Sequence, residues 1–182
     1  MNIGDVIIYG NHGICKVIGL QDMCMGEKIS PYYVLKPVFH TASTVYISAI
    51  SDRRKTEIRR ILSADEIFSL LHNMSGKDFV WIKDNHKRKE LYKQILADGN
   101  RSQLVKLVKT LHTHQQELKN TNKKLHISDE CFLKDAEKTL CEEFAYVLDI
   151  KCKEVMPFIC EQIEIALKKT KDSSSAVQHA PF

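Results

Sequence analysis

The sequence predicts an α+β protein, in which a small β-module precedes a compact helical bundle. Short β-branched and aromatic runs fill roughly the first fifty residues, whereas helical periodicity appears only after about residue 57. Strands and helices that are separated along the chain favour two units over a single mixed sheet. We therefore expect a β-domain in residues 1–55 and a helical domain in 56–170. A disordered tail is expected in 171–182, which is Ser-rich and has no period.

The β-module is predicted from short apolar runs that are separated by turns. Gly10-Asn11-His12-Gly13 closes the first run, and Gly26 marks a later turn. Strands this short must curl into a small barrel or sandwich to bury their apolar faces. The predicted strands are 6–9, 14–20, 32–35 and 44–47.

The first two helices are predicted from their capping residues. Ser63-Ala64-Asp65-Glu66 is a capping-box pattern, and Gly76 is expected to end the helix that it opens. A second helix is expected to begin somewhere in 78–85 and to run to about Ala97, with Gly99 as its left-handed C-cap.

Three further helices follow. Asn100 or Ser102 can cap the third, whose leucines and valine repeat at helical spacing. The fourth is expected to begin near Ser128, and the fifth to cover roughly 152–170. Pro157 either lies in the first turn of the fifth helix or kinks it.

Composition narrows the class of protein. The 182 residues carry a net charge of +4, and 43% of them are apolar. We find no secretory signal and no membrane-spanning run, so a cytoplasmic protein is expected. The six cysteines contain no C-x-x-C pair, and His112 and His114 would lie on different helix faces. We therefore expect no metal, no cofactor and no disulfide framework.

No sequence pattern indicates catalysis. The phosphate-loop, nucleophile-elbow and zinc-protease motifs are missing from the sequence. Glu142 and Glu143 offer two carboxylates, but adjacent helical residues diverge by about 100°. We expect these two side chains to lie on a solvated helix face. The chain is predicted to be a non-enzyme without catalytic residues.

The segment 81–100 carries a cluster of cations. On a helix, Leu91, Tyr92, Ile95 and Leu96 would form a buried stripe that Lys83 and Lys87 flank, with His86, Lys89 and Lys93 on the opposite surface. Such cations can neutralise DNA phosphates with little sequence preference. The alternative is a solvated helix face made soluble by lysines.

Trp81 has two interpretations that depend on where this helix begins. A helix that includes Trp81 places it on the stripe of Tyr92 and Ile95, in the core. If Asp84 is the N-cap, Trp81 lies outside the helix, where an exposed aromatic side chain could wedge against a DNA base step.

From residue 2 to about 165 the sequence resembles the CarD-like transcription regulators. The opening IGDVIIYGNHGICKVIGL is similar to the start of that family, and YYVLKP and TVYIS resemble its next two strands. KRKELYKQILADGN is similar to its second helix, with Asn100 in place of aspartate. LVKLVKTLHTHQQEL and SDECFLKDAEKTLCEEFAYVL resemble its later helices.

The resemblance implies a Tudor-like (SH3-like) β-barrel that binds the RNA polymerase β subunit. This module is also similar to the polymerase-interacting part of transcription-repair coupling factors. The resemblance further implies a helical domain at the upstream edge of the promoter bubble, which stabilises the open complex and reads no defined operator. The residues that would contact polymerase are Met23, Tyr33, Val45, Tyr46 and Ile47. Those that would contact DNA are Trp81, Lys83, Asn85, His86, Lys87, Arg88 and Lys89.

The sequence departs from the family at several of these positions. Met23 and Tyr46 replace basic residues that the family often uses against polymerase. The family's wedging tryptophan corresponds to Asn85, so either Trp81 takes over the role or the wedge is absent. The competing hypothesis is a protein-interaction adaptor that docks a partner on the edge of the β-domain and never touches DNA.

Overall fold

The computed structural model describes residues 1–182 except 26–27, 41–42, 51–57, 75–80 and 177–182. The chain divides into two compact units, Met1–Ser63 and Ala64–Phe182, which we call the β-unit and the helical unit. Strands lie only in the first and α-helices only in the second, as far as the described residues go. The predicted α+β class is therefore confirmed.

The β-unit is an antiparallel sheet in the order β4-β3-β2-β1-β5. Its strands are β1 (Val6–Tyr9), β2 (Ile14–Met25), β3 (Lys28–Pro37), β4 (Val45–Ser48) and β5 (Ile58–Arg60). Among the described strands, β4 and β5 are the two edges and do not pair with each other. The sheet is therefore open at the place where a barrel would close.

The first turn of the sheet requires glycine. A short 3-10 helix, Gly10–His12, joins β1 to β2, and Gly10 and Gly13 have φ angles of 43° and 68°. A side chain at such a φ is strained, so the glycines of the predicted turn are explained by the backbone.

β5 was missed in the sequence because it is only three residues long and two of them are arginines. It pairs with β1, with Ile7 opposite Arg60 and Tyr9 opposite Ile58. Residues 58–60 therefore belong to the β-unit and not to the helical domain predicted from residue 56. The predicted boundary itself, like the predicted turn at Gly26, lies outside the described residues.

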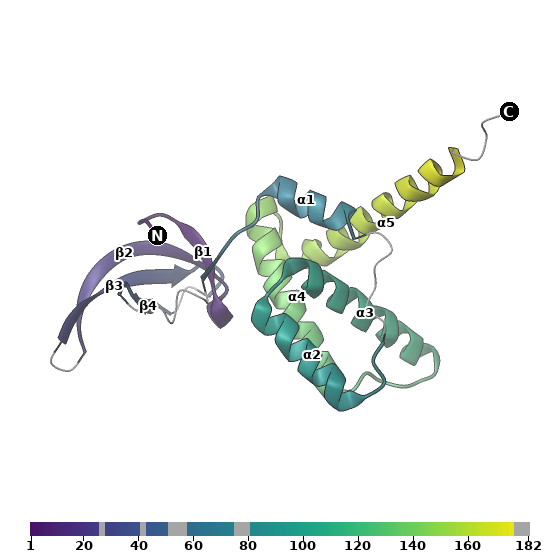
Figure 1. Cartoon of the computed structure of the whole chain (residues 1–182), viewed down its shortest axis with the longest axis horizontal. Coiled ribbons are helices and arrows are strands. Elements are labelled where there is room, and N and C mark those ends of the chain that lie inside the picture. The colour runs from purple at the N-terminus through teal and green to yellow at the C-terminus, as the bar shows by residue number, and fades with distance from the viewer. Residues whose placement is uncertain (26–27, 41–42, 51–57, 75–80, 177–182) are drawn as a thin grey trace. The chain divides into compact units, whose positions relative to one another are not determined.

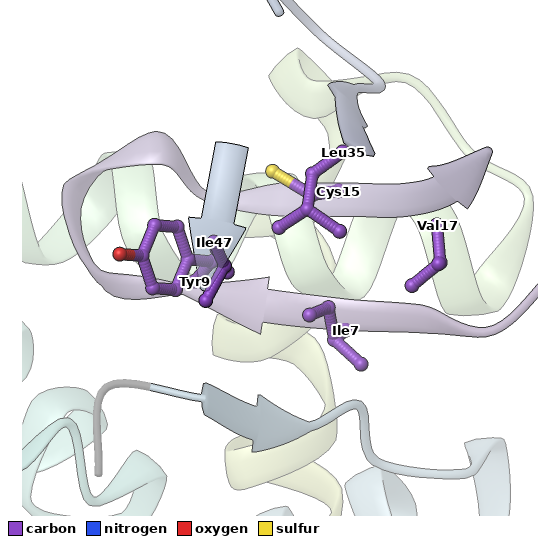
Figure 2. Close-up of a cluster of buried hydrophobic side chains, with 6 residues drawn as sticks. All are labelled: Ile7, Tyr9, Cys15, Val17, Leu35 and Ile47. Carbon is purple, nitrogen blue, oxygen red and sulfur yellow. The ribbon is translucent and has the colours of Figure 1, made fainter. Parts of the chain in front are cut away.

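Apolar side chains from four strands form the core of the β-unit. They are Ile7, Tyr9, Cys15, Val17, Leu35 and Ile47 (Figure 2). Tyr33, Val45 and Ile58 pack against this cluster and are partly buried. Because Tyr33 lies opposite Ile47 in the register and Leu35 opposite Val45, the core-facing side chains of β3 and β4 form one continuous row.

The helical unit contains five α-helices in its described residues (Figure 1). α3 and α4 contact each other, α4 contacts α5, and α2 contacts both α3 and α4. None of the described helices is long and apolar enough to cross a membrane. The helices are α1 (Ala64–His72), α2 (Asn85–Asp98), α3 (Arg101–Asn120), α4 (Ile127–Leu148) and α5 (Cys152–Ala176).

Capping residues explain where α2 and α3 begin and end. The Asp84 carboxylate accepts from the backbone N–H groups of His86 and Lys87 and caps α2. Gly99 ends that helix with a φ of 57°, as predicted. Asn100 then caps α3 by accepting from the backbone N–H of Gln103, which selects it over Ser102.

The remaining helix ends differ from the predictions. α4 begins after His126 instead of Ser128, because the His126 Nδ1 accepts from the Ser128 backbone N–H. α1 ends at His72, and the predicted end at Gly76 lies outside the described residues.

α5 also differs from its prediction. It extends to Ala176 and so includes 171–176, which were predicted to be disordered. Pro157 lies beyond the first turn of this helix, and it has no N–H to donate to the Lys153 carbonyl.

Candidate functional site

Arg88 is the most highly connected of the predicted DNA-binding residues, and it is buried. Only 6% of its surface is exposed. Its guanidinium donates to both Asp129 carboxylate oxygens, at 3.2 Å from Nε and 2.8 Å from Nη2. It also donates to the Ile82 carbonyl at 2.8 Å, the Lys83 carbonyl at 3.5 Å and the Asn85 Oδ1 at 3.1 Å. These contacts use the full donor capacity of a guanidinium.

This geometry corrects the prediction that Arg88 grips a phosphate. A guanidinium that is buried against a carboxylate and saturated by protein acceptors has no donor left for DNA. The missed signal was helical periodicity, because Arg88 lies at i, i+4 and i+7 with the buried Tyr92 and Ile95. Arg88 thus belongs to the buried stripe of α2.

Trp81 is neither a core residue nor a free wedge. Trp81 precedes the Asp84 cap and so lies outside α2, which is the position that the wedge interpretation required. Its ring stacks on His114 of α3 with centroids 3.6 Å apart, and the Arg88 guanidinium carbon lies 4.5 Å from the ring centroid. The indole is therefore held on the helical unit by an aromatic stack and a cation–π contact.

The other predicted DNA-binding residues lie around the start of α2. Lys83, Asn85, His86 and Lys87 are exposed, and Lys89 is half-buried. The Asn85 side chain is committed to Arg88, and Lys93 forms an ion pair with Glu90 at 3.2 Å. The side chains of Lys83, His86, Lys87 and Lys89 remain, and we call these four residues the basic surface.

The prediction for the adjacent carboxylates Glu142 and Glu143 was also wrong. Glu143 is 1% exposed, and Glu142 is buried as well, so neither lies on the solvated face that the sequence suggested. The Glu143 carboxylate accepts from Arg101 Nε at 2.9 Å and Nη2 at 3.0 Å. A bidentate arginine thus compensates the burial of Glu143 on α4, as Arg88 does for Asp129 near the other end of that helix.

The polymerase-binding residues predicted on β3 and β4 fall on two faces of the sheet. Tyr33, Val45 and Ile47 face the core of the β-unit, and Ile47 is only 1% exposed. Ile47 is therefore a packing residue, which corrects its assignment as a contact. Tyr46 points to the other face, is 38% exposed and lies opposite Val34 on the edge strand β4.

Met23 lies on the outer part of the β2–β3 hairpin. In the described register, 22–25 and 28–31 pair with one another, while the β1 and β4 pairings are confined to 14–16 and 32–35. Met23 is half-buried, and Leu20 and Ile29 are among the exposed large apolar side chains of this hairpin.

The described residues contain no cluster of three or more metal-binding side chains. The six cysteines form no disulfide bond with one another. Burial raises the pKa of the Cys141 thiol to about 11, with smaller contributions from Cys152 and the nearby glutamates. Burial also raises the pKa of Cys160. Both thiols are therefore protonated near neutral pH, and protonated thiols are poor nucleophiles.

A comparison with protein families decides the identity of the β-unit. Residues 1–62 match the family model described as the CarD-like/TRCF RID domain. TRCF stands for transcription-repair coupling factor, and RID for RNA polymerase-interacting domain. The β-unit is a CarD-like/TRCF RID domain. The match includes all five strands and ends one residue before the division between the units. No curated protein matches the chain.

The family assignment has a definite extent. The RID match covers 62 of the 182 residues, so the likeness of the helical unit to CarD-like regulators remains a prediction. The RID family is a non-catalytic RNA polymerase-binding domain. The match therefore supports RNA polymerase as a partner of this chain.

Proposed function

We propose that the chain is a bacterial transcription regulator that binds the RNA polymerase β subunit through its RID and promoter DNA through the basic surface. In this proposal it acts at the upstream edge of the promoter bubble and stabilises the open complex. The observation that carries the proposal is the RID match over residues 1–62.

The polymerase half of the proposal rests on the edge strand and the hairpin of the RID. β4 has a neighbour only on its β3 side among the described strands, so a strand of the partner could pair with its other side. Tyr46 supplies an exposed aromatic side chain on this strand. Because Tyr46 and Met23 are uncharged, we expect apolar complementarity to contribute more than charge to the polymerase contact.

The DNA half rests on the grouping of the basic surface at one end of α2. Lys83 and Lys87 are both exposed, and the Asp84 cap fixes the backbone between them. Cations held by an ordered backbone can neutralise phosphates at lower conformational cost than cations on a disordered tail. No base-reading pattern accompanies them, so affinity with little sequence preference is expected.

The polymerase contact can be tested by a pull-down of β-subunit fragments on the full-length protein. We expect binding by the native protein and a clear loss with Tyr46→Glu, which places a charge on the edge strand. Lys153→Glu, an exposed substitution on α5, is the control and should bind as the native protein does. No binding by the folded native protein would reject the polymerase half.

The DNA contact can be tested by measuring affinity for a promoter fragment at several salt concentrations. Affinity should fall steeply between about 50 and 200 mM salt, and constant affinity over that range would reject the electrostatic contact. Lys83→Glu with Lys87→Glu should weaken binding strongly, while Lys153→Glu should not. If polymerase is retained but DNA is not bound, the protein is an adaptor that docks through the edge of its sheet.

A further inference from the structure

The segment 81–85 is tied to all three helices that surround it. Trp81 stacks on His114 of α3, and the Ile82 and Lys83 carbonyls accept from Arg88 of α2. Arg88 is in turn fixed by Asp129 in the first turn of α4. Residues 81–84 precede α2, and Arg88 gives the Ile82 and Lys83 carbonyls hydrogen-bond donors that fix this stretch to the bundle.

A buried ion pair is not in general required for the stability of a helical bundle. Apolar residues of similar volume often replace a buried ion pair at no cost, because the Coulombic gain is offset by desolvation. What an apolar pair cannot supply is the hydrogen bonding to the Ile82 carbonyl and the Asn85 side chain. Those contacts hold the backbone that carries Lys83. The main role of the Arg88–Asp129 pair would then be to fix this backbone, and its contribution to stability would be secondary.

We propose that Arg88 and Asp129 are positioning residues, which fix the segment 81–85 and thereby set the geometry of the basic surface toward DNA. The part of this inference that concerns DNA rests on the proposed function. Asp129 is included in this proposal, although it lies 41 residues from Arg88 along the sequence and its negative charge would be repelled by DNA. Neither residue touches DNA in this arrangement.

The chain offers a matched control for this inference. Arg101 and Glu143 form a second bidentate pair that includes α4, and the Glu143 carboxylate is as buried as that of Asp129. None of the hydrogen bonds described for Arg101 reaches the segment 81–85. The same replacement at the two pairs therefore separates loss of a buried ion pair from loss of the position of this segment.

The experiment compares the full-length double variants Arg88→Met/Asp129→Leu and Arg101→Met/Glu143→Leu. Trp81 is the single tryptophan, so selective excitation reports on its environment. At the first pair we expect red-shifted emission, stronger acrylamide quenching and a slope of log affinity against log salt shallower by about 1, equivalent to one lost phosphate contact. At the second pair all three readouts should match those of the native protein.

Native emission, quenching and salt slope in folded Arg88→Met/Asp129→Leu would overturn the proposal. The same changes in both double variants would also overturn it, because they would reflect a general loosening of the bundle. If circular dichroism shows that the first double variant does not fold, the same three readouts are measured on the single variant Arg88→Lys instead. Lysine keeps the charge beside Asp129 but lacks the planar fork, so the same shifts are expected, and native values would reject the proposal.

Failure of the proposed function gives a different pattern. If the native protein binds no DNA at low salt, the DNA-binding function is rejected, and with it the part of this inference that concerns DNA. The fluorescence comparison still decides whether the pair fixes the segment, since it requires no ligand.

Discussion

The Arg88 guanidinium and the Asp129 carboxylate join α2 to α4 by two parallel hydrogen bonds, 3.2 Å and 2.8 Å long. The exposed fractions of the two residues are 6% and 1%, so both charges have been removed from water. Each charge is stable in the interior only because the other neutralises it. Loss of one partner should therefore be more damaging than loss of both.

Arg88→Ala should lower the free energy of unfolding by about 3–5 kcal/mol, because it leaves the Asp129 carboxylate buried without its cation. Lys87→Ala, at the exposed neighbouring position, should change it by no more than about 0.5 kcal/mol. Urea unfolding followed by circular dichroism measures both. Equal, small losses for the two variants would mean that Arg88 is solvated and available to DNA after all.

Tyr92 should make the protein less stable at high pH. Burial and the nearby Asp129 raise the pKa of Tyr92 from 10.0 to about 12, although Arg88 opposes this shift. Below pH 10 the phenol is protonated in both states, but between about pH 10 and 12 only the unfolded state releases the proton. Unfolding then releases a proton, so the free energy of unfolding falls as the pH rises through this window, by on the order of 2 kcal/mol.

Tyr92→Phe tests this pH dependence because it keeps the ring that meets Phe132 edge-on, with centroids 5.7 Å apart. Urea unfolding at pH 9 and pH 11 should show a smaller decline for the variant than for the native protein. Cys141, whose pKa is raised to about 11, contributes equally to both proteins and cancels in the comparison. Identical declines would show that the Tyr92 phenol ionises as it does in water.

Trp81→Ala should cost an intermediate amount of stability. The variant loses a stack on His114 and a cation–π contact with Arg88, each of which contributes roughly 0.5–1.5 kcal/mol. A loss of about 1–3 kcal/mol in urea unfolding is therefore expected, with Trp81→Phe as the control that keeps an aromatic ring. A loss near zero would indicate a freely exposed wedge, and a loss near 5 kcal/mol a core residue.

Periodicity and capping chemistry predicted the fold because they are local. The Asp84 and Gly99 caps and the stripe of Tyr92 and Ile95 each depend on residues within a few positions of one another. Charge pairing is not local. The partners of Arg88 and Glu143 lie 41 and 42 residues away, so the sequence showed cations and carboxylates without showing which of them neutralise each other.

The candidate site was therefore predicted as a region but not residue by residue. Lys83 and Lys87, predicted to flank the buried stripe, are exposed, whereas Lys89, predicted to face solvent, is half-buried. Arg88, between two lysines, is turned inward. On β4, alternation alone assigns Val45 and Ile47 to one face and Tyr46 to the other. Which face is buried depends on the strands that pair on either side, and the sequence does not specify those.

Ile47 and Tyr46 should respond oppositely to truncation, because adjacent residues of β4 face opposite sides of the sheet. Ile47→Ala opens a cavity in the core of the RID and should cost about 2–5 kcal/mol in urea unfolding. Tyr46→Ala should change stability by about 0.5 kcal/mol, since its side chain is exposed.

If Tyr46 is an aromatic anchor for polymerase, its loss should weaken binding to the β subunit at least about fivefold. A pull-down at a temperature where both variants remain folded separates these effects. Weakened binding by Ile47→Ala alone would assign the polymerase contact to another surface.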